Sequence, residues 1–194
     1  INVLREVFEH TKPDLLKDSD LHTWIQANSW VRVYSVYRML KKKNKQASWI
    51  DWTELRDPST KEIDQLWVKN YESVLFYAWI QYWCEKQFQA AAQDCEAIGV
   101  KIKGDIPILI SEDSADVWGH RQFFDMNNRA GAPPDMFCKD GQNWRFPCYQ
   151  WDVLKASNYQ WWKDRLQQAS KFYHAFRIDH VLGFFRIWQI PEKH

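Results

Sequence analysis

The sequence predicts an α/β fold, and three observations support that prediction. An amphipathic pattern over residues 61–97, typical of helix, ends at Gly99. The β-rich run that follows it is VKIKGDIPILI, residues 100–110. A second helical pattern at 159–173 leads into the apolar run at 175–179. Helix followed by strand, repeated along a chain, is the pattern of a parallel sheet.

Three further segments complete the expected order of elements. Residues 19–42 carry apolar side chains three and four positions apart, which predicts a helix with Ser19 or Asp20 as its N-cap. A short helix is expected near residues 116–124. Residues 125–150 have no clear period and are rich in glycine and proline, so they are expected to form a long loop. A loop of that length in a compact domain is usually functional.

Two helix boundaries are also predicted. The pattern at 61–97 fits either one helix or two helices broken near Tyr77. Asn158 is the expected N-cap of the helix at 159–173.

The composition excludes several classes of protein. The 26 basic and 25 acidic residues give a net charge of +1, and the basic run KKKNK reads as a solvated turn, so we expect no nucleic-acid partner. The four cysteines have no zinc-finger or CxxC spacing and are expected to be free thiols of a reducing compartment. No signal peptide or membrane-length apolar run is visible, so the sequence predicts a soluble, cytoplasmic protein without a membrane partner.

The run AFRIDHVLGFFRIW, residues 175–188, places three ionisable side chains inside an apolar segment. In a strand, Arg177 and Asp179 point to the same side, which puts a guanidinium beside a carboxylate and favours the ionised acid. From these residues alone, a structural ion pair and a functional site are equally good explanations. Asp105 also follows a predicted strand, and catalytic residues of (β/α)8 barrels lie at the C-terminal ends of strands.

Two αβ units are too few to close such a barrel, which needs about 250 residues. The chain begins at Ile1 without Met and ends just after an apolar segment, so we expect it to be a fragment of a larger polypeptide.

Several separate motifs resemble the amylomaltase or 4-α-glucanotransferase family, glycoside hydrolase family 77. In chain order they are GDIPILISEDSADVWGHRQFF, GAPPDMF, GQNWRFPCYQWD and FRIDHVLGFFRIWQIP. Earlier segments agree too, so the resemblance covers residues 28–191. The GQNW and RIDH motifs look closest to the plant-type cytosolic disproportionating enzymes and their bacterial relatives.

The resemblance implies part of a (β/α)8 TIM barrel, around its third and fourth strands, with helical insertions. It also implies transfer of α-1,4-glucan segments between maltooligosaccharides or glucans by a retaining double displacement. Asp179 matches the family's nucleophile, Arg177 matches the residue that orients it, and His180 matches a sugar contact before the cleaved bond.

The resemblance further implies a set of substrate-binding residues. Trp144 matches a tryptophan that stacks on a glucose ring beyond the cleaved bond, as its flat indole would allow. Asp105 matches an acidic residue after the third barrel strand, and Phe137 falls among loop residues that touch the glucan. Asp135 lies in a matched motif, where a turn cap explains it equally well.

Two positions depart from the family pattern. Many members carry Tyr where this chain has Met136, and the family usually has Gly where this chain has Arg145. Gly tolerates backbone conformations that Arg does not, so either the chain path differs here or Arg145 is strained.

We therefore expect residues 1–98 to be a helical segment of the catalytic domain, and 99–194 to be a partial barrel with an active-site loop at 125–150. No metal or cofactor is expected. The family's acid/base Glu lies on a later strand, so the 194-residue chain alone is expected to show no turnover. A non-catalytic glycan-binding module and an α-glucan hydrolase of the same superfamily are the alternatives.

Overall fold

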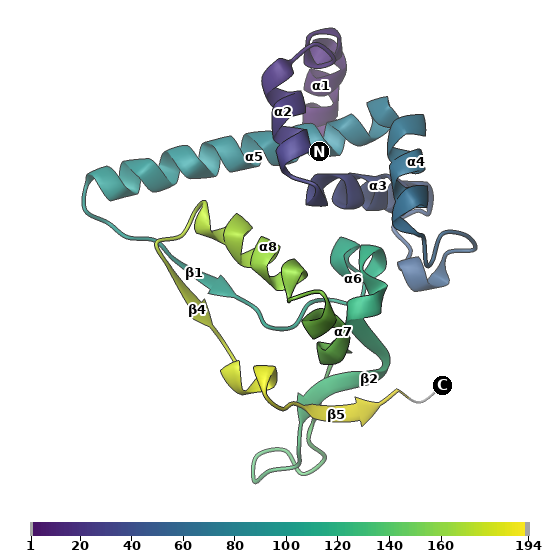
Figure 1. The fold of residues 1–194 in the computed structure, drawn as a ribbon, viewed down its shortest axis with the longest axis vertical. Coiled ribbons are helices and arrows are strands. Elements are labelled where there is room, and N and C mark those ends of the chain that lie inside the picture. The colour runs from purple at the N-terminus through teal and green to yellow at the C-terminus, as the bar shows by residue number, and fades with distance from the viewer. Residues whose placement is uncertain (1, 193–194) are drawn as a thin grey trace. The chain divides into compact units, whose positions relative to one another are not determined.

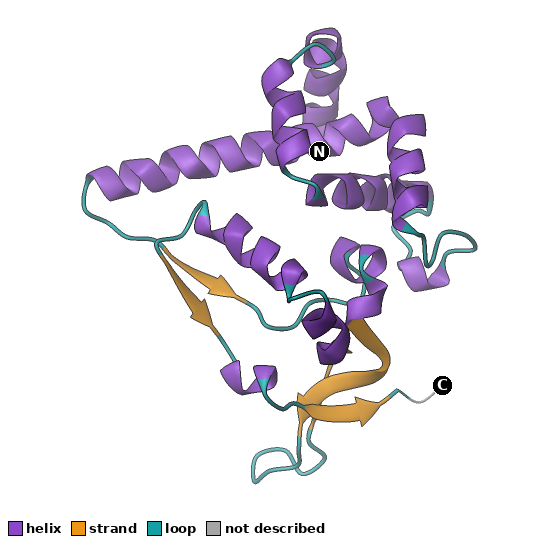
Figure 2. Ribbon diagram, viewed as in Figure 1, coloured by secondary structure: helices purple, strands orange, loops and turns teal. Residues whose placement is uncertain are grey.

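The computed structural model describes residues 2–192, which divide between Gln87 and Phe88 into two compact units. The first unit is helical, and the described strands all lie in the second (Figure 2). The α-helices of the first unit, labelled in Figure 1, are α1 (Asn2–Leu15), α2 (Ser19–Ala27), α3 (Trp30–Lys43), α4 (Thr60–Lys69) and α5 (Tyr71–Ala97), which continues into the second unit. A 3-10 turn (Trp49–Asp51) lies between α3 and α4.

The second unit alternates strands with short helices. Its elements are β1 (Lys103–Ile106), α6 (Ala115–Gly119), β2 (Phe124–Ala132), β3 (Gln142–Tyr149), α7 (Trp151–Ala156), α8 (Gln160–Ser170), β4 (Ala175–Ile178) and β5 (Trp188–Pro191), with 3-10 turns at Arg121–Phe123 and Val181–Phe184.

Local hydrogen bonds break the two long predicted helices into four. The helix predicted over 19–42 is α2 and α3, and its N-cap is Asp18, whose Oδ1 accepts from the backbone N–H groups of Asp20 and Leu21. The pattern at 61–97 breaks at Asn70, not near Tyr77. The Asn70 side chain donates to the carbonyl of Leu66 at 2.9 Å and so caps the end of α4.

Aromatic packing forms the core of the first unit. The rings of Phe8 and Phe76, both fully buried, meet edge to face with centroids 5.3 Å apart. The guanidinium of Arg5 lies 3.6 Å from the centre of the Phe76 ring. Among the described residues, no helix is long and apolar enough to cross a membrane.

In the second unit, β1 and β4 form a parallel pair in which Asp105 lies opposite Arg177. Gly99 ends the preceding helix, as predicted, with a left-handed φ of +79°. The regular strand is shorter than the predicted run at 100–110. The ring of Tyr173 covers the backbone of Gly104, where a Cβ would overlap it, and Phe88 of α5 packs on Tyr173.

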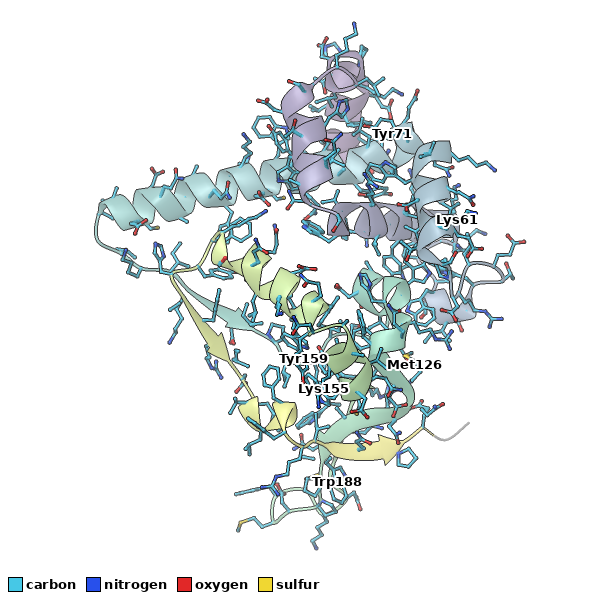
Figure 3. The ribbon with its side chains drawn as sticks, in the orientation of Figure 1. Lys61, Tyr71, Met126, Lys155, Tyr159 and Trp188 are labelled. Atoms are coloured by element: carbon cyan, nitrogen blue, oxygen red, sulfur yellow. The ribbon has the colours of Figure 1, made fainter. Side chains whose placement is uncertain are left out.

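The predicted long loop at 125–150 is instead an antiparallel hairpin. Strands β2 and β3 pair, and β5 pairs with the other edge of β2 (β2 and β5 are labelled in Figure 1), so the sheet order is β3-β2-β5. Trp188, labelled in Figure 3, lies on β5 opposite Gly131 of β2. The register shifts on both sides of Arg129, and Pro147 interrupts β3, so the strands lack the regular alternation that reveals a strand in a sequence.

An aromatic cluster fixes the base of this hairpin to the helices beside it. Tyr149, at the end of β3, packs on Phe124, Trp161 and Trp162, with ring centroids between 5.3 and 5.9 Å apart. Its hydroxyl donates to the carbonyl of Ile108 at 2.5 Å, which ties the hairpin to the segment that follows β1.

The predicted cap of the last helix is wrong. The N-cap of α8 is Tyr159, which makes no side-chain cap. Asn158 and Tyr159 instead have left-handed φ values of +54° and +56°, so the chain turns sharply between α7 and α8.

Candidate active site

The parallel strands bring two carboxylates to one arginine. Arg177 of β4 lies opposite Asp105 of β1, and its Nη1 lies 3.1 Å from Asp105 Oδ2. Its Nη2 lies 3.2 Å from Oδ1 of Asp179, two residues further along. We call Asp105, Arg177 and Asp179 the acid cluster. It lies where the carboxyl ends of both strands meet, as the sequence predicted for Asp105 and Asp179.

The backbone after β4 holds Asp179 in place. Its Oδ1 also accepts the backbone N–H of His180 at 3.0 Å. His180 has a left-handed φ of +53° and leads into the 3-10 turn Val181–Phe184. A Cβ at Gly183 would lie 3.0 Å from His180 Cδ2, so the absence of a side chain at Gly183 lets the imidazole lie close to that turn.

Trp144, on β3, meets His180 edge to face. The ring centroids are 5.0 Å apart and the planes are 89° apart. The indole Nε1 donates to Gln142 Oε1 at 2.9 Å, which fixes how the ring is turned. The hairpin thus brings Trp144 to the acid cluster by way of His180.

The chain beside Trp144 adopts the strained conformation that the sequence left open. Arg145 has a φ of +61°, in the left-handed region where a Cβ is unfavourable. The Asn143 Oδ1 accepts the Arg145 N–H at 2.8 Å and supports this backbone. The position is therefore strained, and this explains why a glycine suits it.

Two predicted substrate-binding residues lie at the tip of the hairpin. Asp135 Oδ1 accepts the backbone N–H groups of Phe137 and Cys138 at 2.8 and 2.7 Å, so it caps the tip turn. The Phe137 side chain is 89% exposed. Within residues 2–192, neither side chain contacts the acid cluster through a hydrogen bond or ion pair.

The sequence reasoning missed three residues that shape this site, namely Gln142, Asn143 and Gly183. Gln142 and Asn143 stand in the GQNW motif, and the side-chain oxygen of each accepts a hydrogen bond from the residue two positions onward. Such local bonds are typical of Asn side chains in turns. A glycine shortly after a charged strand end was the available signal for Gly183.

The acid cluster is open to solvent, with side-chain exposures of 58% for Asp105, 55% for Arg177 and 70% for Asp179. Exposed ion pairs contribute little to stability, so this arrangement is poorly explained as a structural device. A solvent-facing carboxylate oriented by an arginine can act as a nucleophile. In the described part of the chain, no group of three or more His, Cys, Asp or Glu side chains is arranged to hold a metal ion.

Comparison with known proteins agrees with this fold. The family model described as 4-alpha-glucanotransferase matches residues 1–194. The chain is 35% identical to the 4-alpha-glucanotransferase DPE2 of Oryza sativa subsp. japonica, over 99% of this chain and 21% of that protein. It is 37% identical to the 4-alpha-glucanotransferase of Chlamydia caviae, over 95% of this chain and 35% of that protein.

A solved structure matches as well. The amylomaltase from Streptococcus agalactiae in complex with acarbose superposes with a TM-score of 0.83 at 29% identity, over 98% of this chain and 41% of that one. The chain belongs to the 4-alpha-glucanotransferase family, glycoside hydrolase family 77. It spans about a fifth to a third of the length of the curated relatives described here.

Proposed function

We propose that the protein to which this chain belongs transfers α-1,4-glucan segments between maltooligosaccharides or glucans by a retaining double displacement. The observation that carries the proposal is the acid cluster, in which Arg177 bridges Asp105 and Asp179 at the ends of parallel strands. Retaining chemistry needs a carboxylate nucleophile next to the sugar C1, and an oriented carboxylate meets that need.

Each residue of the site has a proposed role. Asp179 attacks C1 of the donor glucose and forms a glycosyl ester, while the leaving oxygen takes a proton from a general acid. Arg177 orients that carboxylate, and Asp105 binds sugar hydroxyls. His180 contacts the sugar before the cleaved bond, and Trp144 stacks on the sugar after it.

The acceptor hydroxyl then attacks C1 and gives its proton to the conjugate base of that general acid. The ester bond breaks, which restores the Asp179 carboxylate and the original anomeric configuration. The exposed Phe137 and the tip turn capped by Asp135 are proposed to contact the glucan further out. The proposed partners are α-1,4-glucans and maltooligosaccharides, without a nucleic acid, a membrane, a metal or a cofactor.

We infer that β1 and β4 are neighbouring strands of a (β/α)8 barrel, with residues 1–98 as a helical segment of the catalytic domain and 99–194 as the barrel part. The parallel pairing of β1 with β4 and the helices between them support this. The four free cysteines support a reducing, cytoplasmic location.

The test uses the full-length protein with maltotriose, followed by chromatography of the products. Wild type is expected to give glucose and a ladder of longer maltooligosaccharides, and Asp179→Asn is expected to give neither. Asp152→Asn, which removes an exposed carboxylate on α7, is the matched control and should keep the ladder. A ladder from Asp179→Asn would overturn the assignment of the nucleophile. Glucose without longer products would indicate a hydrolase, and no reaction from wild type would favour a glycan-binding module.

A further inference from the structure

Arg129 is a buried arginine on β2 that binds two carboxylates from distant parts of the second unit. Its Nη2 pairs with Glu112 Oε1 at 2.5 Å, and its Nε pairs with Glu192 Oε2 at 3.1 Å. Its Nη1 donates to the carbonyl of Met126, which Figure 3 labels on the same strand, at 2.8 Å. We call Glu112, Arg129 and Glu192 the clasp.

The ion pairs of the clasp are partly buried, so breaking them is costly. The side chain of Arg129 is 8% exposed, and those of Glu112 and Glu192 are 22% and 40% exposed. Burial raises the pKa of Glu112, and the neighbouring Arg129 opposes that rise. Removing the arginine would leave carboxylates partly buried without their cation, which is much costlier than the loss of an exposed ion pair.

The clasp lies partway along the hairpin, between its base at Phe124 and Tyr149 and its tip. In the three-stranded sheet, Arg129 lies opposite Pro147 of β3 and Ile190 of β5. Trp144 precedes Pro147 on β3, nearer the tip. Arg129 therefore holds the central strand, β2, at a point between the base of the hairpin and the level of Trp144 on β3.

The two carboxylates come from the two segments that leave the acid cluster. Glu112 lies in the segment after β1, which carries Asp105. Glu192 directly follows β5, which comes after Asp179 and the 3-10 turn. Arg129 thus ties the hairpin to the segments that follow the two strands of the acid cluster, and its ion pairs are with Glu112 and Glu192.

We propose that Arg129 is a positioning residue that sets the affinity for the acceptor sugar, because the clasp holds Trp144 beside His180. This proposal rests on the proposed function. Without the clasp, Asp179 and Arg177 keep their own contacts, so the donor bond is still cleaved. The acceptor then meets a less well-placed indole, and misplacement by about 1 Å can lower a rate by up to about a hundredfold.

The test separates the two half-reactions in the full-length protein. A 4-nitrophenyl maltooligosaccharide whose terminal 4-hydroxyl is blocked can act as a donor but not as an acceptor. The initial burst of nitrophenol reports the formation of the glycosyl enzyme and the fraction of active protein. The increase of steady-state release with added maltose gives the KM for the acceptor.

Glu192→Gln and Arg129→Met are the test variants, and Glu192→Gln keeps the experiment open should Arg129→Met fail to fold. Both are expected to raise the acceptor KM, by several-fold for Glu192→Gln, with the burst rate unchanged. Lys163→Met, an exposed site on α8, is the control with no change. A lower burst amplitude with an unchanged acceptor KM in both variants would mean that the clasp is merely structural, and would overturn the proposal.

A spectroscopic readout distinguishes this failure from failure of the proposed function. With 5-fluorotryptophan incorporated, the ¹⁹F signal of Trp144 is assigned by its loss in Trp144→Phe. Glu192→Gln is expected to shift or broaden that signal, and Lys163→Met is not. An unchanged signal would overturn the positioning role. A wild type whose nitrophenol release does not respond to maltose would instead overturn the proposed function, whatever the ¹⁹F signal does.

Discussion

The edge of the Trp144 indole meets the His180 imidazole with ring centroids 5.0 Å apart, although one residue lies on β3 and the other follows β4. Each ring has its own support, Gln142 for the indole and the turn at Gly183 for the imidazole. The pair is therefore the point where the hairpin and the parallel strands meet.

This contact predicts that the two rings are energetically coupled in catalysis. Trp144→Leu, His180→Ala and the double variant of the full-length protein should lose kcat/KM for transfer non-additively, with a coupling of about 1 kcal/mol. Trp144→Leu combined with Tyr159→Leu, an aromatic that is 40% exposed at the start of α8, should show no coupling. Additive losses for the first pair would mean that the rings act independently.

The left-handed Arg145 predicts a stabilising substitution. Arg145→Gly should raise the free energy of unfolding by up to about 1 kcal/mol, because glycine accepts a φ of +61° without a Cβ clash. Part of that gain is offset by the larger entropy of glycine in the unfolded chain. The check is urea denaturation beside Lys139→Gly, a tip residue without a positive φ, which should not be stabilised. Equal effects at both positions would contradict the strain argument.

The capping box at the start of α4 predicts a pH-dependent contribution to stability. Ser59 accepts from the Glu62 N–H, and Glu62 Oε2 accepts from the Ser59 N–H and hydroxyl at 2.8 and 2.7 Å. Ser59→Ala should lower the free energy of unfolding by about 1 kcal/mol at neutral pH.

The sign of the pH dependence follows from the lowered pKa of Glu62, which the hydroxyl and then the backbone N–H of Ser59 cause. A carboxyl whose pKa is lower in the folded than in the unfolded state stabilises the fold at pH values above its unfolded-state pKa. This contribution to the free energy of unfolding is lost as the pH falls below about 4. The difference in stability between wild type and Ser59→Ala should therefore become smaller in acid, while the bond from the Glu62 N–H to the Ser59 hydroxyl keeps part of it. Glu54→Gln, another exposed acid of the same unit, serves as the control.

The cysteines should differ sharply in their reaction with iodoacetamide. Cys148 is 1% exposed, whereas Cys84 is exposed. Burial is the main cause that raises the pKa of the Cys148 thiol to about 11. At pH 8 roughly a thousandth of Cys148 would be thiolate, and the thiolate is the reactive form. Peptide mapping should find Cys84 alkylated and Cys148 intact in native protein, with both alkylated in urea. Early labelling of Cys148 would contradict its burial.

The acid cluster could be predicted because side-chain alternation and strand order, which the sequence shows, determine which residues meet at the strand ends. Alternation places Arg177 and Asp179 on one side of β4, and parallel pairing brings Asp105 to the same edge. The hairpin could not be predicted, because its two strands carry shifts in register and a proline, and β5, the third strand of the sheet, comes from far away in sequence. The break at Asn70 was missed because the apolar pattern continues through it, and a side-chain hydrogen bond to Leu66 decides the end of α4.

The ring of Tyr173 fills the space that a Cβ at position 104 of β1 would need, so only Gly104 leaves room for it. Neither residue can change alone: a methyl group at 104 requires a smaller or displaced ring, and a smaller ring leaves a void beneath Phe88. Two positions with such a constraint evolve as a pair. Alignment of related sequences should therefore show covariation, with alanine or serine at 104 accompanied by a smaller side chain at 173.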